Sequence, residues 1–460
     1  MSRAHVALVA ALVCGLASAQ EVSVFSTTMA QSWKGETPGF DQSTYAPATQ
    51  FLGIDATKLG TEALSLHLYG WGRTDLSDAS WTGDKKSAGD LSYGYLQYRF
   101  AEANAEVKAG RFAVTQSGSY EQVDGVSAQA DLRNGFTVSA FAGRPVLYTP
   151  LVGDAKTDYE YQRDFIFGTR LCLRLRKLGE VGVTFLQDGT TAAKDLSIPS
   201  TVDYTRKQMG FDFHLVPVAR LDFQGRTLFD LASHLATTPG AASPSKIAEH
   251  DYSVRVKVTD LVAITGGFIQ RNFFAYFAGT SLPSLFRQDE KDKFRAQSGS
   301  VIFGAADAIQ VVADYKHTHR ESYGDTNRFG GDLRWTPKSD LKVQTGFGFH
   351  RVSADNVVLV NGRYPSYSLS HNELRAWVMA EKGAFSASLD GIHQNFSDKQ
   401  NPNLNGITAV YEVVGSLGWQ ATQSFKLSGD VSYGANPLAK KETRGLLRAE
   451  YRFGGKGGQK

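Results

Sequence analysis

The feature that most constrains the fold of this chain is a strand-like alternation of apolar and polar residues that recurs from residue 62 to residue 453. In the stretch 91–111, Leu96, Tyr98 and Phe100 fall on one face of an extended chain, and polar residues stand between them. After a short interruption the alternation resumes. Two such runs joined by a short turn predict an antiparallel hairpin, and the rest of the chain repeats this unit.

We count about 20 such segments, long enough for the tilted strands of a membrane barrel. They cover residues 62–74, 89–100, 104–112, 121–133, 135–144, 158–176, 179–188, 203–216, 219–231, 247–259, 261–274, 291–304, 307–318, 325–336, 340–352, 368–382, 384–394, 406–420, 423–434 and 440–453.

The connections between these segments alternate in length. Tight junctions fall at 134, 177–178, 217–218, 260, 305–306, 337–339, 382–383 and 421–422. Long polar junctions fall at 75–88, 145–157, 189–202, 232–246, 275–290, 353–367 and 395–405. Short turns at one end and long loops at the other are typical of outer-membrane barrels, with the turns in the periplasm and the loops outside the cell. The sequence therefore predicts an all-β fold, a transmembrane antiparallel up-and-down β-barrel of about 20 strands.

Charged residues at every second position of these strands cannot face lipid, because a buried Arg or Lys there costs about 2–4 kcal/mol. They are therefore expected to line a wet, mixed-charge lumen. The candidate pore-lining residues are Arg99, Glu160, Asp164, Arg170, Arg174, Arg176, Arg206, Asp222, Arg226, Arg255, Lys257, Arg334, Arg444 and Arg448. Two interpretations of these charges stay open: they set ion selectivity, or they pair across strands and merely fill a wet interior.

The two ends of the chain follow other patterns. Residues 1–19 have a short positive start, an apolar run and an A-x-A site, which predicts a signal peptide. Residues 20–61 contain Pro and Gly interruptions and are expected to form an N-terminal periplasmic arm or plug. The barrel is expected over 62–453, and 454–460 form a C-terminal tail. Cys172 is the only cysteine after residue 19, so no intrachain disulfide is expected.

The last strand resembles that of bacterial outer-membrane barrels, which ends on an aromatic residue read by the assembly machinery. Here Phe453 occupies that place, although seven residues follow it. The stretch Phe51–Pro145 contains the segments SLHLYGWGR and EVKAGRF. It more particularly resembles porin-like barrels found beside multihaem cytochromes. This resemblance implies outer-membrane lipid, the barrel-assembly machinery and a periplasmic multihaem cytochrome as partners.

Several other functions find little support in the sequence. A net charge of +3 does not point to nucleic acid, and no C-x-x-C-H motif is present for covalent haem, so no cofactor is expected. His317 and His319 could form a metal pair but lack further ligands nearby in sequence, and no metal site is predicted. An outer-membrane hydrolase would need His and carboxylate groups to converge at one rim. Its candidates are His234, His317, His319 and His371, with Glu321 and Glu373.

The sequence thus predicts a non-enzymatic, porin-like channel in the outer membrane of a Gram-negative cell, which passes small hydrophilic solutes or ions. The first alternative is a sleeve around a multihaem cytochrome, for electron transfer across the outer membrane. The second is an outer-membrane barrel hydrolase.

Overall fold

The structure is a computed structural model. It describes residues 19–35, 44–77, 86–116, 119–146, 165–189, 206–231, 247–272, 293–304, 308–320, 324–337, 340–355, 369–401, 404, 406–437 and 439–454. The signal peptide expected over residues 1–19 falls outside this part of the chain, apart from its last residue. Within these ranges, no helix is both long enough and apolar enough to cross a membrane.

Nearly all of the described chain is β-structure. The strands are β1 (Ala19–Gly35), β2 (Thr44–Tyr45), β3 (Pro47–Leu59), β4 (Leu64–Asp75), β5 (Ser87–Phe100), β6 (Ala105–Gln116), β7 (Ser119–Asp131), β8 (Phe136–Pro145), β9 (Phe165–Leu175), β10 (Gly179–Gly189), β11 (Arg206–Val218), β12 (Leu221–Asp230), β13 (Ile247–Lys257), β14 (Val262–Asn272), β15 (Lys293–Phe303), β16 (Ile309–Arg320), β17 (Gly324–Trp335), β18 (Gln344–Ala354), β19 (His371–Lys382), β20 (Phe385–Phe396), β21 (Ala409–Thr422), β22 (Phe425–Asn436) and β23 (Ala439–Phe453). A 3-10 turn, η1 (Arg133–Gly135), joins β7 to β8.

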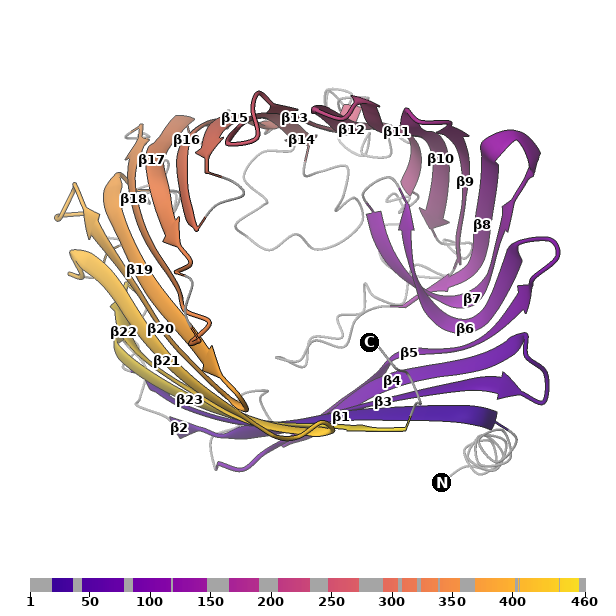
Figure 1. Ribbon diagram of the computed structural model, residues 1–460, viewed down its shortest axis with the longest axis horizontal. Coiled ribbons are helices and arrows are strands. Elements are labelled where there is room, and N and C mark those ends of the chain that lie inside the picture. The colour runs from indigo at the N-terminus through magenta and orange to yellow at the C-terminus, as the bar shows by residue number, and fades with distance from the viewer. Residues whose placement is uncertain are drawn as a thin grey trace, which may run out of the picture.

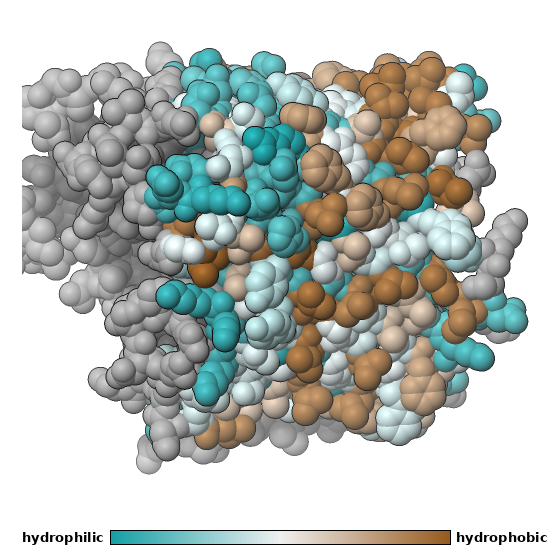
Figure 2. Space-filling model, turned by 90° about the vertical axis from the view of Figure 1, so that its left-hand side faces the viewer, coloured by the Kyte–Doolittle hydropathy of each residue, from teal (hydrophilic) through white to brown (hydrophobic). Residues whose placement is uncertain are grey.

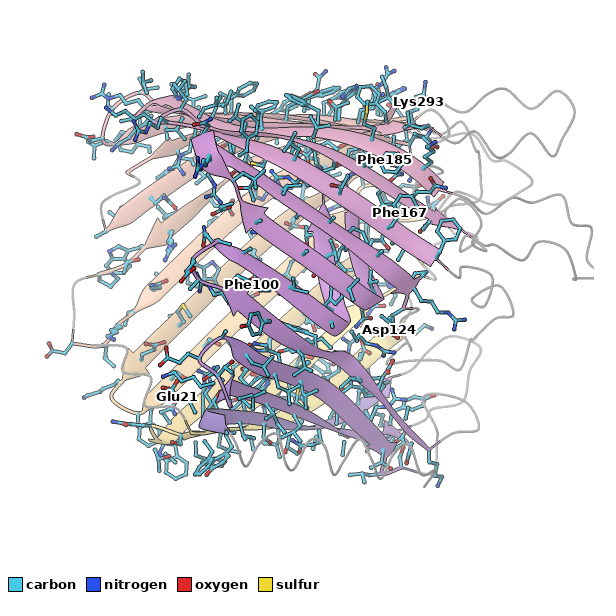
Figure 3. The ribbon with its side chains drawn as sticks, turned by 90° about the vertical axis from the view of Figure 1, so that its right-hand side faces the viewer. Glu21, Phe100, Asp124, Phe167, Phe185 and Lys293 are labelled. Atoms are coloured by element: carbon cyan, nitrogen blue, oxygen red, sulfur yellow. The ribbon has the colours of Figure 1, made fainter. Side chains whose placement is uncertain are left out.

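The described strands form one closed antiparallel barrel (Figure 1). Each long strand pairs with its neighbours in the chain, and β1 closes the sheet by pairing with β23 from Val24↔Phe453 to Gly35↔Glu442. Because β2 has only two residues and extends the pairing of β1, the wall consists of 22 full strands. Figure 3 shows the strands crossing the wall at a tilt, with Glu21 and Lys293 at opposite ends. Closure leaves no sheet edge unpaired, as a barrel in lipid requires.

The predicted all-β barrel is confirmed, and each of the 20 expected segments overlaps a strand. The expectation of an arm or plug over 20–61 is wrong, because β1 and β3 are wall strands paired with each other from Ala19↔Leu59 to Ala30↔Ala48. These two strands account for the difference between about 20 and 22. Their signal is weak because outward positions carry polar residues: Gln50 donates a hydrogen bond to Ser26 Oγ at 2.8 Å and accepts one from Thr28.

The outer face of the sheet is apolar. Leu417, Val431 and Leu447 are 71%, 62% and 61% exposed, a degree of exposure that large apolar side chains tolerate in contact with lipid. Figure 2 shows such residues spread over the wall, with hydrophilic residues gathered toward one end. A closed antiparallel barrel with an apolar outer face and a polar inner face is a transmembrane barrel of the outer-membrane type, which places the protein in the outer membrane.

Most connections are sorted by length, as predicted, although β6–β7, β16–β17 and β22–β23 are joined by only two or three residues at the end that carries the long connections. Tight turns at one end include 101–104, 132–135, 176–178, 219–220, 383–384 and 423–424, whereas the other end carries the long connections 146–164, 190–205, 231–246, 273–292 and 355–370. The tight turns need left-handed backbone: Asn134 has φ 63° and Gly383 has φ 57°. Asn and Gly are the residues that adopt this conformation most readily, so the turns are fixed locally by the sequence.

Candidate functional site: the inner wall of the barrel

The inner wall is the face opposite the exposed apolar residues, and it carries most of the predicted pore-lining set. The strand register places these residues on the inner face: Arg99, Arg170, Arg174, Asp222, Arg226, Arg255, Lys257, Arg334, Arg444 and Arg448. The alternation of apolar and polar residues in the sequence was enough to assign these residues to the inner face. A shift of one residue in strand register would have moved all of them to the lipid-facing side.

The remaining predicted residues have other placements. Glu160 and Asp164 lie outside the described residues. Arg206 is in register with Asp188 at the start of β11, and its side chain is outside the described part. Arg176 lies in the turn after β9 and not on the strand, because the wall strand ends at Leu175. Of the three neighbouring candidates Arg170, Arg174 and Arg176, the strand β9 therefore carries Arg170 and Arg174.

The inner-face charges pair with one another across strands. Arg170 on β9 binds Asp212 on β11, with Nη2 2.6 Å from Oδ1, and its Nη2 lies 3.4 Å from Glu180 Oε1 on the intervening strand. Gly182 on β10 makes this contact over one strand possible, because a Cβ there would lie 2.8 Å from Arg170 Nη2 and 2.9 Å from Asp212 Oδ1. A glycine in the middle strand thus lets two strands that are not neighbours share an ion pair.

A second cluster lies on β12, β13 and β14. Glu249 is 2% exposed and accepts hydrogen bonds from Arg226 Nε at 2.5 Å and from Arg271 Nε at 2.7 Å. Asp251 lies 3.4 Å from Arg226 Nη2. Two carboxylates and two guanidinium groups compensate each other here, as a nearly buried carboxylate requires.

A third cluster lies on β16, β17 and β18, and it was not predicted from the sequence. Arg328 Nη1 lies 2.7 Å from Asp314 Oδ1, and His350 Nε2 lies 2.8 Å from Asp314 Oδ2 and 3.7 Å from Asp332 Oδ2. The four residues are up to 36 positions apart in sequence and meet only because the register sets Asp314 opposite Gly330 and Gly330 opposite His350. The glycines in FGGD and GFGFH are the sequence signal that could have located it.

A polar recess of about 440 Å³ opens between the first two clusters. Its lining includes Arg170, Asp212, His214, Gln224, Arg226 and Asp251. Arg170 and Arg226 each bind a carboxylate on one side and border the recess on the other. The recess therefore offers cationic hydrogen-bond donors and anionic acceptors to a small polar solute.

Other predicted residues pair locally near the strand ends. Asp222 lies 3.2 Å from His214 Nε2, Arg174 lies 3.4 Å from Asp131 Oδ2, and Arg444 lies 2.8 Å from Glu442 within its own strand. Lys257 Nζ lies 3.0 Å from Asp260 in the turn 258–261 and lowers the pKa of that carboxyl below its ordinary value, through a hydrogen bond and its charge. Six of the predicted residues are therefore in ion pairs, Arg170, Arg174, Asp222, Arg226, Lys257 and Arg444, whereas Arg334 donates instead to the uncharged Gln344 Oε1 at 2.8 Å.

The inner face of the first strands also carries a row of aromatic side chains. Tyr69 on β4 stacks with Phe25 at 5.7 Å between ring centroids and with Tyr93 at 5.5 Å, and Tyr93 contacts Tyr95 at 5.9 Å. Gly53 lies beneath Phe25, since a Cβ there would be 1.9 Å from the ring. Tyr95 also packs against an inner-face apolar cluster made of Phe112, Val123, Phe141, Ile166 and Leu186. The sequence analysis did not identify this aromatic row.

The hydrolase candidates do not converge within the described part of the chain. His317 and His319 share the outer face with Tyr315, whereas His371 lies on the inner face opposite Val352. His234 and Glu321 fall outside the described residues, and Glu373 accepts a hydrogen bond from Gln394 at 2.8 Å.

A different hydroxyl–imidazole–carboxylate chain does form on the inner wall. His67 lies between Ser65 Oγ, 3.0 Å from Nε2, and Asp55 Oδ1, 2.6 Å from Nδ1. The groups beside Ser65 are engaged elsewhere: Gln97 donates to Glu106 at 3.0 Å, and Thr57 donates to Glu21 at 3.4 Å. Acyl transfer needs donors aimed at a developing oxyanion, and these contacts direct the neighbouring donors away from Ser65. We interpret the chain as a structural hydrogen-bond network.

Comparison with known proteins bears on the fold alone. No family model matches the chain, and no curated protein matches it in sequence. Among solved structures, the siderophore receptor PirA from Pseudomonas aeruginosa matches with a TM-score of 0.53 at 11% identity, over 94% of this chain and 80% of that one. The ferric enterobactin receptor PfeA from the same organism matches with a TM-score of 0.53 at 9% identity, over 94% and 80%. The outer-membrane protein OpdK, also from that organism, gives 0.41 at 8%, over 95% and 100%.

The closed barrel, its apolar outer face and its charged inner face together define the class of the protein: a porin-like β-barrel of the outer membrane.

Proposed function

We propose that the barrel is a channel that passes small hydrophilic solutes or ions through a mixed-charge lumen. The observation that carries this proposal is the inner wall of β9 to β20, where ion-pair clusters face the interior and the polar recess lies between two of them. A wall of this kind stays hydrated and offers transient partners to polar solutes, whereas a wall meant to be packed with apolar groups would leave these charges without solvent.

The pairing also predicts how selective the channel is. Each guanidinium of the three clusters stands within 4.0 Å of a carboxylate, well inside a Debye length of about 8–10 Å, so the fields of the two partners largely cancel along that part of the path. We therefore infer weak ion selectivity. Selection among solutes then depends mainly on size and on the recess.

Liposome swelling with uncharged sugars of graded size tests this function. Proteoliposomes that contain the purified barrel should swell at rates that fall with sugar size, and protein-free liposomes should not swell. The matched control is heat-denatured barrel reconstituted in the same way. Swelling no faster than this control, from protein that is shown to be folded, would contradict the proposal.

A second candidate, a sleeve filled by a partner such as a periplasmic multihaem cytochrome, is favoured by two observations. Twenty-two strands make a barrel wider than the 16–18-stranded porins that hold an aqueous channel, and barrels of this width are usually plugged. The aromatic row at Phe25, Tyr69, Tyr93 and Tyr95 offers apolar contact area on the inner wall. Co-purification of a haem protein with the native barrel would support the sleeve, and its absence together with sugar uptake would support the channel.

A further inference from the structure

We propose that the inner wall holds a binding site for one divalent transition-metal ion, formed by Asp314 on β16, Asp332 on β17 and His350 on β18. The donor atoms of these three residues all lie within 4.8 Å of one another. They come from three adjacent strands of a closed barrel, which is a rigid support for a coordination site.

The strand register creates this arrangement. Asp314 pairs with Gly330 and Gly330 pairs with His350, so the Asp and the His face each other across a residue without a side chain. A Cβ on Gly330 would lie 2.4 Å from the His350 ring, and a Cβ on Gly348 would lie 2.2 Å from Asp332 Oδ1. Both glycines therefore leave the space that the imidazole and the second carboxylate occupy.

The distances suit a metal ion. His350 Nε2 lies 2.8 Å from Asp314 Oδ2 and 3.7 Å from Asp332 Oδ2. Ligands held at about 2.1 Å from a tetrahedral ion are about 3.4 Å apart, so the two observed distances bracket the required one. A small movement of the Asp332 side chain, which is 53% exposed, would complete the set.

The surrounding charges leave the donor atoms available. Arg328 binds the other oxygen of Asp314, Oδ1, at 2.7 Å, which orients the carboxylate and leaves Oδ2 toward His350. Arg375 Nη2 is engaged by Asp390 Oδ2 at 2.7 Å. The imidazole of His350 is only 5% exposed and so is held in place, while exposed Asp332 provides access from the lumen.

The donor set indicates the class of ion. One imidazole nitrogen with two carboxylate oxygens suits Zn²⁺ and neighbouring first-row divalent ions. Mg²⁺ prefers all-oxygen, octahedral sites and keeps its waters, so it should bind weakly here. An ion bound here would add two positive charges to this part of the wall.

The test is zinc binding to the full-length barrel, purified without a histidine tag, with calorimetry for affinity and elemental analysis for stoichiometry. The wild-type barrel should bind Zn²⁺ at this site, and Mg²⁺ at tenfold excess should not displace it. His350→Gln and Asp332→Asn should each weaken that binding at least tenfold or remove one zinc per barrel. His67→Gln is the matched control, because His67 also faces the lumen beside an aspartate, Asp55, but belongs to no such three-donor cluster among the residues that the structure describes.

Heat-modifiable migration on gels establishes that each variant is folded, and it is read before binding is compared. Equal zinc binding by the folded wild type, His350→Gln and Asp332→Asn would overturn the site. Equal loss in His67→Gln would also overturn it, since binding would then reflect any lumenal histidine. Displacement of zinc by Mg²⁺ would also overturn the proposal, because the site would then recognise the charge of the ion and not the nitrogen and oxygen donor set. Because the readout is binding and not transport, the result is independent of whether the barrel conducts.

Discussion

At the scale of single residues, the inner wall depends on compensation, and the Arg170–Asp212 pair is the clearest case. Arg170→Gln should leave Asp212 and Glu180 without their cation and shift the reversal potential in a salt gradient toward cation preference, more strongly at low salt. Asp212→Asn should shift it in the opposite direction, and the double variant should lie close to the wild type. Identical reversal potentials in all four conducting proteins would show that this pair does not border the ion path.

Cys172 gives a second prediction at this scale. It lies on the inner face, as its alternation with Arg170 and Arg174 indicated, but it is 2% exposed. A small charged thiol reagent should therefore leave the folded barrel unmodified and react only after denaturation. Rapid labelling of folded protein, measured by mass spectrometry, would contradict this prediction and show that the Cys172 thiol is accessible from the lumen.

The residue scale also shows what could be predicted and what could not. The face of each residue followed from alternation, because the strand period is two. The side chains with which these residues form ion pairs could not be predicted from alternation. Arg170 and Asp212 are 42 residues apart and on strands that are not neighbours, so their contact depends on two registers and on Gly182. The Asp314–Asp332–His350 cluster and the aromatic row were missed for the same reason.

At the scale of strands, the first two long strands are the test of the architecture. Because β1 pairs with both β3 and β23, deletion of 21–59 from a chain exported behind a standard signal should abolish the heat-modifiable barrel. Deletion within the long connection 275–290 is the control and should leave the barrel intact. A folded, conducting barrel without 21–59 would mean that this segment is a dispensable plug, as its weak alternation had indicated.

The connections give an independent prediction of orientation. Epitope tags within 275–290 or 395–405 should be labelled on intact cells, because the long connections of outer-membrane barrels face outward. A tag within the tight turn at 383–384 should be labelled only after the outer membrane is permeabilised. The reverse labelling pattern would contradict this orientation and show that the long connections face the periplasm.

At the scale of the whole molecule, the sorting of connection lengths was enough to predict the fold. Sorted turns and alternating faces both require a closed antiparallel wall in lipid, and the structure has one. The strand count fell short by two because Ser26, Thr28 and Gln50 place hydrogen-bonded polar groups on the outer face, which hides the alternation of β1 and β3. Strand periodicity carries no information on what occupies the lumen.

The central claim is that the barrel by itself is an open, weakly selective channel, and single-channel recording of the purified, cytochrome-free protein in a planar bilayer tests it most directly. We predict discrete conductance steps with a reversal potential close to zero in a salt gradient, because the charges of the three inner-wall clusters are paired with one another. Folded barrels that insert without any conductance step would contradict the claim, and the filled sleeve would then be the better account.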